Sequence, residues 1–185
     1  MNIGRRLLLA IGAVAVSLLN PVAGPAVAAT ATQLNADGQA ALNRLYAQSS
    51  RATRYAKDAR AILVFPKIVK VGLLIGGQGG EGVLFVHGRP AGYYKIHAVS
   101  YGLQAGGQSF SYALFLMNEA ALTYLNKSDG WAIGSGPSVV VVDKGAAKST
   151  TSTTVAKDVY AFPFGQKGLM AGLGLEGSKI TRISK

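Results

Sequence analysis

Apolar residues in the first third of the chain recur with a helical period. Between residues 34 and 56 the apolar and small side chains share one side, and Arg44, Arg51 and Arg54 fall on the other. The apolar side comprises Leu34, Gly38, Ala41, Leu42, Leu45, Ser49, Ala52 and Ala56. This spacing predicts an amphipathic helix that breaks near Ser49-Ser50. Its many small residues favour close packing on a sheet over insertion into lipid.

Most of the sequence after residue 60 has the pattern of β-strands. The apolar run Ala61–Phe65 stops at Pro66, which predicts a buried strand that ends there. The sequence His87-Gly88-Arg89-Pro90 predicts a turn. Other predicted strands are Ile68–Ile75, Val83–Val86, Tyr93–Tyr101, Val139–Val142 (covered on both faces), Val159–Phe164, Leu169–Leu175 and Lys179–Ile183.

A second helix and a polar connection interrupt these strands. The helix is predicted over Met117–Leu125, because Asn118 can cap it and the alanines that follow are strong helix formers. Lys144–Thr154 is polar and of low complexity, which indicates a surface loop.

One glycine-rich stretch occurs twice. Gly72–Phe85 (GLLIGGQGGEGVLF) and Gly102–Phe115 (GLQAGGQSFSYALF) match at seven of fourteen positions. Each copy predicts a strand, a tight turn or bulge at Gly-Gly-Gln, and another strand. Internal duplication and chance both remain open, because glycine is frequent throughout the chain. The glycines would permit sharp strand bends and close backbone approach.

These elements together predict an α+β fold. We expect a twisted antiparallel β-barrel or sandwich, with an N-terminal helix and one further helix packed on it.

The N-terminus has the three regions of a secretory signal peptide. Met1–Arg6 is basic, Leu7–Leu19 is apolar, and Ala26-Val27-Ala28 supplies small residues for cleavage. A membrane-spanning helix would need about 20 apolar residues, and Asn20-Pro21 interrupts this run. Residues 1–28 are therefore predicted to be a cleaved signal peptide, and residues 29–185 a single periplasmic or secreted domain. Cleavage after Ala28 and cleavage after Ala29 both remain open.

Positive charge is concentrated in one part of the predicted domain. Without Arg5 and Arg6, seventeen basic residues stand against eight acidic ones, a net charge of +9. Between Arg44 and Lys70, seven basic residues are opposed only by Asp58, which places +6 within 27 residues. A field of this sign favours anionic partners. We define the basic cluster as Arg44, Arg51, Arg54, Lys57, Arg60, Lys67 and Lys70, and predict that it binds anionic phospholipid at a membrane surface.

Other uses of this charge are weaker alternatives. An ordinary solvated helix face would carry a similar row of arginines. Nucleic acid would require aromatic side chains beside the charges, and the basic helix offers only Tyr46 and Tyr55. Nucleic acid is therefore not predicted as a partner, whereas other proteins of the cell envelope are.

The sequence predicts no enzyme, cofactor or metal site. Gly77–Gly82 fits G-x-G-x-x-G, but a strand pattern follows where a nucleotide site needs a helix. Ser100 resembles a nucleophile elbow, which also requires a following helix, and its possible bases His87 and His97 have no evident acid partner. The two histidines and eight scattered acids show no metal-ligand spacing, and the chain has no cysteine. Glu81 is expected to be a structural hydrogen-bond partner.

A series of short motifs resembles the SYLF domain family. In order they are Ala59–Pro66 (ARAILVFP), Gly80–Leu84 (GEGVL), Leu116–Glu119 (LMNE), Gly134–Pro137 (GSGP), Lys167–Gly172 (KGLMAG) and Leu175–Gly177 (LEG). The resemblance covers nearly all of the predicted domain and implies a lipid-binding, non-catalytic module. Eukaryotic members bind phosphoinositides and, in the yeast branch, actin filaments, whereas bacterial members are exported.

This chain departs from the eukaryotic pattern at its N-terminus. Eukaryotic members reach the membrane through an amphipathic N-terminal segment, where this chain has a predicted signal peptide. The resemblance therefore implies binding of anionic phospholipid in general, and neither phosphoinositide nor actin. We expect an exported module that attaches reversibly to anionic phospholipid through the basic helix and the adjoining strand. The alternative is a structural or interaction protein of the envelope that does not bind lipid directly.

Overall fold

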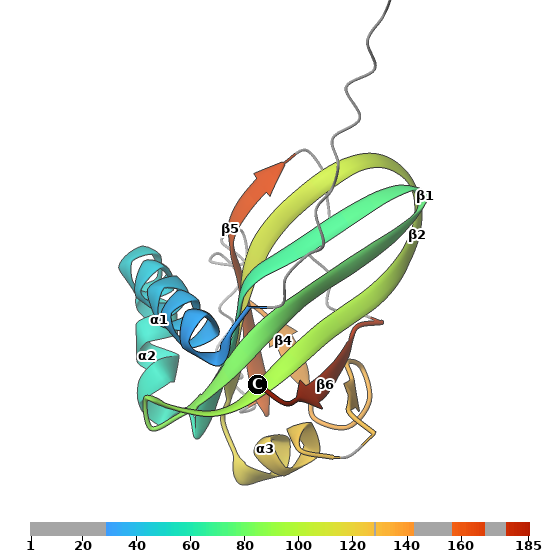
Figure 1. The fold of residues 1–185 in the computed structure, drawn as a ribbon. Coiled ribbons are helices and arrows are strands. Elements are labelled where there is room, and N and C mark those ends of the chain that lie inside the picture. The colour runs from blue at the N-terminus through green and yellow to red at the C-terminus, as the bar shows by residue number, and fades with distance from the viewer. Residues whose placement is uncertain (1–28, 128, 143–156, 169–176) are drawn as a thin grey trace, which may run out of the picture.

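Two long strands form a hairpin that organises the whole fold (Figure 1). The computed structural model describes residues 29–127, 129–142, 157–168 and 177–185. The elements are α1 (Ala31–Gln48), α2 (Ser50–Asp58), β1 (Ala61–Val86), β2 (Arg89–Leu116), α3 (Glu119–Leu125), β3 (Trp131–Ala132), β4 (Val139–Val141), β5 (Val159–Gly168) and β6 (Lys179–Ile183). They confirm the predicted α+β class. The predicted signal peptide, the connection Lys144–Thr154 and the predicted strand Leu169–Leu175 lie outside the described residues.

The two N-terminal helices meet at one serine, which confirms the predicted break. The Ser49 amide donates to the Leu45 carbonyl at 2.9 Å and closes α1. The Ser49 hydroxyl accepts from the Ala52 amide at 3.2 Å and caps α2. One residue therefore satisfies backbone groups of both helices. Asn118 caps α3 in the same way, as predicted, by accepting from the Ala121 amide at 2.8 Å.

The described strands form one six-stranded sheet. Its order is β3-β6-β2-β5-β4, with β1 also paired to β2. Most pairs are antiparallel as expected, but β4 runs parallel to β5. The expectation that Val139–Val142 is covered on both faces was wrong: Val141 is exposed and its two predecessors are half-buried. Four valines indicate a strand, but they do not reveal whether it lies at the centre or the edge of a sheet.

The hairpin bends within its strands. Both copies of the repeated stretch lie inside β1 and β2, and no tight turn forms at Gly-Gly-Gln in either. The first copy pairs regularly at residues 76–78, so the bulge is absent there too. In the second copy, the register shifts between Gly102 and Gly106, directly before Gly-Gly-Gln and opposite Gly72–Leu74. A Cβ atom placed on Gly72 would lie 2.7 Å from the Gly76 Cα, so the bend needs glycine there. Figure 1 shows both strands curling back at this point, away from α1 and α2. The predicted turn at His87-Gly88 is present, with φ of 48° and 76°.

The curl creates two separate apolar layers. The inner layer lies within the curled sheet and includes Phe65, Ile68, Tyr112 and Trp131, with Leu125 contributed by α3. The outer layer lies between the helices and the outer face of the sheet. It contains Leu42 and Leu45 of α1 together with Val83, Phe85, Ala113, Phe115 and Phe162. Strands that carry both layers alternate inward and outward side chains wherever their pairing is regular.

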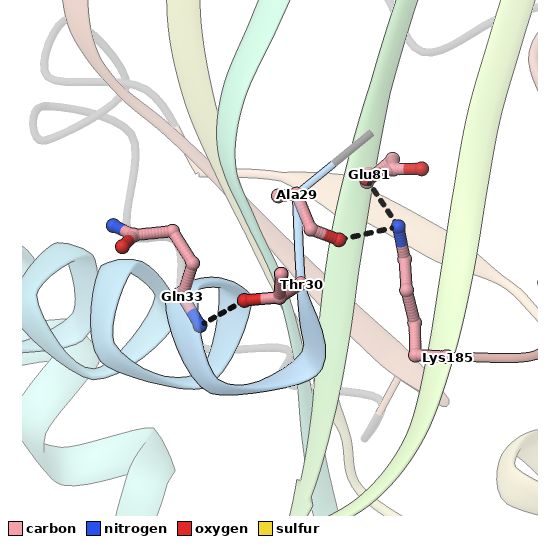
Figure 2. Close-up of polar contacts among 5 residues, drawn as sticks. All are labelled: Ala29, Thr30, Gln33, Glu81 and Lys185. Atoms are coloured by element: carbon pink, nitrogen blue, oxygen red, sulfur yellow. Dashed lines mark hydrogen bonds and ion pairs between the residues drawn. The ribbon is translucent and has the colours of Figure 1, made fainter. Parts of the chain in front are cut away.

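The two ends of the described domain are joined by a lysine (Figure 2). The Lys185 ammonium donates to Glu81 Oε2 at 2.7 Å and to the Ala29 carbonyl at 2.8 Å, and its side chain is only 8% exposed. Thr30, the next residue, caps α1 by accepting from the Gln33 amide at 3.2 Å. Glu81 on β1 therefore holds the C-terminal Lys185, and Lys185 in turn holds the backbone just before α1.

Asp158 joins β5, β4 and α3. Its carboxylate accepts from the amide and the hydroxyl of Ser138, each at 2.8 Å, and from the Asn118 side-chain amide at 2.7 Å. The hydrogen bonds from Ser138, followed by that from Asn118, hold the pKa of Asp158 below its usual 3.8.

Substitution of Gly82 tests whether close approach of the two arms of β1 stabilises the curl. A Cβ at Gly82 would lie 2.6 Å from both the Val64 carbonyl oxygen and Phe65 Cδ1. We expect Gly82→Ala to lower the free energy of unfolding by about 1–3 kcal/mol through overpacking. In the matched control Gly79→Ala, the nearest atom is the Ile96 carbonyl at 3.6 Å, so the change should stay below about 1 kcal/mol. Equal losses in urea titrations of the two variants would contradict this account.

The Asp158 junction predicts a specific acid sensitivity. Because the folded-state pKa is lowered, the stabilisation is complete above the usual value of 3.8 and is lost as the pH falls through the folded-state pKa. Between about pH 7 and about pH 2.5, wild type should therefore lose more unfolding free energy than Asp158→Asn. Asp58→Asn, which changes an exposed carboxylate at the end of α2, should follow wild type. Parallel pH profiles for wild type and Asp158→Asn would show that the junction contributes nothing.

Candidate functional site

Ser111 on β2 is flanked by irregularities in both neighbouring strands. β1 has one extra residue between the pairs Phe65–Tyr112 and Ile68–Phe110. β5 has one extra residue between the pairs Ser111–Phe164 and Ser109–Lys167. We refer to these two irregularities as the paired bulges. Bulges of this kind reorient the side chains around them.

Local sequence explains both bulges. Pro66 has no amide hydrogen, so β1 cannot continue its regular pairing there. The Ser111 hydroxyl donates to the free Pro66 carbonyl at 2.7 Å, which fixes the bulge in β1. On the other side, Gly165 has a φ of 64°, a left-handed conformation that favours glycine.

The bulge in β1 reverses which side chains face outward. Phe65 and Ile68 both belong to the inner layer although they are three residues apart. Strict alternation would place them on opposite faces, so the extra residue shifts the pattern by one. From Lys67 onward, odd-numbered side chains of β1 therefore point outward, and Lys67 is exposed.

An open hollow of about 630 Å³ lies over the paired bulges. Three cationic side chains from three different elements line it: Arg44 from α1, Lys67 from β1 and Lys167 from β5. Gln48, Ser109 and Ser111 add polar groups. We call this site the basic hollow. Its cations converge because the register places Lys167 opposite Ser109, beside the bulge that carries Lys67.

The described lining of the basic hollow carries positive charge only. No acidic side chain is among the described residues that line it. Within the described ranges, the side chains of Arg44, Lys67 and Lys167 also form no ion pair or hydrogen bond. Three cations without an acidic counterpart, set beside hydroxyl and amide donors, form a suitable site for an anionic group such as a phosphate.

A smaller hollow adjoins the basic hollow. It measures about 240 Å³ and shares Gln48 and Phe164 with the larger one. Its lining is mixed. The other apolar residues are Leu45, Val142, Phe162 and Pro163, and the other polar ones are Ser49, Ser50 and Arg51.

The rest of the basic cluster is spread over other surfaces. Arg54 lies with its guanidinium carbon 5.9 Å from the centre of the Tyr55 ring. Tyr55 stacks on Tyr160 of β5 at 4.1 Å, so this arginine helps attach α2 to the sheet. Burial, followed by the neighbouring Tyr160, raises the pKa of Tyr55. Lys57 is exposed in the last turn of α2.

Arg60 and Lys70 point away from the basic hollow. Arg60 forms an exposed ion pair with Glu119 at 3.9 Å and lines a different hollow, near the hairpin turn. Lys70 is even-numbered and falls on the opposite face of β1 from Lys67. The structure therefore brings Arg44 and Lys67 of the basic cluster together in the basic hollow, with Arg51 nearby.

Lys167 is the residue that the sequence did not indicate. It lies 100 positions after Lys67 in sequence, and only the pairing of β2 with both β1 and β5 brings the two lysines together. The glycine and lysine in Phe164-Gly165-Gln166-Lys167 were a usable signal, because glycine within a strand often marks a bulge.

The described structure does not place the nucleotide-binding and nucleophile-elbow motifs in the strand-turn-helix geometry that their chemistry requires. Gly77–Gly82 lies within β1, so no helix follows it. Residue 100 lies within β2, with no strand-to-helix turn. Among the described residues, no three histidine or acidic side chains lie close enough to hold a metal ion. None of the described helices is long and apolar enough to cross a membrane.

A helix-covered curled sheet with an open basic hollow defines a binding domain. The model of the Ysc84 family, described as "Las17-binding protein actin regulator", matches residues 97–185. This match confirms the predicted resemblance to the SYLF family, to which the motifs at residues 116–119, 134–137 and 167–177 also pointed. No curated protein matches the chain. The match begins inside β2, yet β2 pairs with β1 over its whole length, so residues 61–86 belong to the same folded unit.

Proposed function

We propose that this protein is an exported module that binds anionic phospholipid reversibly at a membrane surface. The observation that carries the proposal is the convergence of Arg44, Lys67 and Lys167 on one open hollow with no acidic neighbour among the described residues. The family resemblance supports a binding role, and the charge of the hollow supports an anionic ligand.

The proposed lipid site differs from the one predicted from the sequence, because only part of the basic cluster lines the basic hollow. Arg44 and Lys67 remain central, Lys167 is added, and Arg51 lies beside the hollow. Arg54, Lys57, Arg60 and Lys70 would act through the general positive field, because they do not line this hollow.

The magnitude of the electrostatic term suits reversible attachment. Each basic residue that reaches an anionic surface contributes about 1 kcal/mol, so three contribute about 3 kcal/mol. On its own this term corresponds to about millimolar affinity, and salt weakens it.

Export is the second part of the proposal. Its support is the signal-like sequence of residues 1–28. The hydrogen bond from Lys185 to the Ala29 carbonyl bears on the position of cleavage. Cleavage after Ala28 leaves this carbonyl in the domain, whereas cleavage after Ala29 removes it. We therefore propose that the mature chain begins at Ala29.

The position of cleavage is tested by expression of the full chain in a bacterium and intact-mass measurement of the periplasmic fraction. The expected mass is that of residues 29–185. A full-length protein retained in the cytoplasm would contradict export. A mature chain that starts at Thr30 would contradict the role assigned to Ala29.

Vesicle binding tests the lipid proposal. Arg44→Gln/Lys67→Gln/Lys167→Gln should weaken co-sedimentation with phosphatidylglycerol vesicles about a hundredfold at low salt, because about 3 kcal/mol is lost. Phosphatidylcholine vesicles should not retain the wild-type protein.

The matched control removes the same charge from exposed sites outside the hollow, as Arg89→Gln/Lys95→Gln/Lys179→Gln. It should lose less than about fivefold, since screening limits distant charges. Equal losses in the two triple variants would show that net charge alone governs binding. Absence of vesicle binding by the wild type would contradict the proposed function and favour an envelope protein as the partner.

A further inference from the structure

The outer face of the sheet is only partly covered by helices. Near the hairpin turn, Val83 and Phe85 pack beneath α1. Near the bend, none of the described helices covers the outward side chains: Val69, Val71, Ile75 and Val99 are between 42% and 64% exposed. We call these four residues the apolar stripe. Four exposed β-branched side chains on one face form a concentrated apolar surface.

The bulge at Pro66–Lys67 places this stripe on the same face as the basic hollow. Lys67, Val69 and Val71 alternate along the outward side of β1. Across the sheet, Val69 pairs with Ser109, which pairs with Lys167, so one row runs from the stripe into the basic hollow.

The stripe continues around the bend to both strands. Val99 on β2 pairs with Gly77, two residues beyond Ile75 on β1, so Ile75 and Val99 are diagonal neighbours on one face. The glycines opposite Val71 and Val99 add no side chain that could shield them.

We propose that the apolar stripe inserts into the outer part of the acyl-chain layer of an anionic lipid bilayer, while the basic hollow binds the lipid phosphates. This inference rests on the proposed lipid-binding function and adds the orientation: the bend of the hairpin enters first. The argument for lipid as the occupant is the juxtaposition itself, because apolar side chains beside lysines match the boundary between acyl chains and head groups. A rise of about 13 Å from Lys67 to Val71 spans that boundary.

Because the chain has no cysteine, single-cysteine variants can report insertion directly. Val71→Cys and Ile75→Cys are labelled with nitrobenzoxadiazole, and Val141→Cys on β4 is the matched control, since Val141 is also an exposed valine. With phosphatidylglycerol vesicles, the labels at 71 and 75 should shift to the blue and be quenched by acyl-chain spin labels. Their quenching by aqueous iodide should fall about threefold or more. The label at 141 should remain in water.

Truncation of the stripe provides a second, label-free measurement. Val71→Ser/Ile75→Ser/Val99→Ser should reduce vesicle retention about tenfold or more. Val141→Ser should leave retention unchanged. Because all four side chains are exposed, the melting temperature should stay near that of wild type in both variants.

The outcomes separate this inference from the proposed function. Vesicle retention with labels 71 and 75 still open to iodide would overturn insertion and leave head-group binding intact. No retention at all would overturn both. A third outcome is that the labels are protected from iodide without vesicles, and that sedimentation velocity shows a dimer for wild type but not for the triple serine variant. This outcome would assign the stripe to contact with a second copy of the chain and overturn insertion.

Discussion

The surface chemistry of this protein depends on one hydrogen bond and the backbone irregularity that it fixes. The Ser111 hydroxyl donates to the Pro66 carbonyl at 2.7 Å and holds an extra residue in β1. That residue shifts the alternation of β1, so side chains beyond it exchange faces. Without the shift, Lys67 and Val69 would point into the curl. A lysine there would have to enter an apolar layer, at a large cost in free energy.

The same face of the sheet therefore changes character along its length. Beneath α1 it is apolar and buried, at the paired bulges it is cationic and open, and toward the bend it is apolar and exposed. The helices stabilise the first region by burying it. The other two regions have no described cover, and they suit the two chemical layers of a lipid surface. Glycine at the bend and at the contact between the arms of β1 allows one hairpin to carry all three regions.

Sequence patterns predicted the parts that depend on local chemistry. The break at Ser49, the cap at Asn118 and the turn at His87-Gly88 follow from residues close together in the chain, and all three are present. The edge position of β4 could not be predicted, because burial of a strand depends on its neighbours. Gly165 indicates a bulge in the sequence, but it does not reveal which strand lies beside it. The position of Lys167 in the basic hollow therefore required the pairing of β2 with β5. The sequence showed that positive charge is concentrated between Arg44 and Lys70. Which of these side chains share a face could be known only from the register of β1.

Orientation on the membrane is the most direct test of the central claim that the bulged face meets lipid. Nuclear magnetic resonance of the uniformly labelled protein on phosphatidylglycerol nanodiscs with a gadolinium-chelating head group would map this orientation without any substitution. The account predicts the strongest paramagnetic broadening at the amides of Lys67–Val71 and Ser109, with α3 and the turn at His87-Gly88 least affected. Strongest broadening at α2 or α3, or uniform broadening over the whole domain, would contradict it.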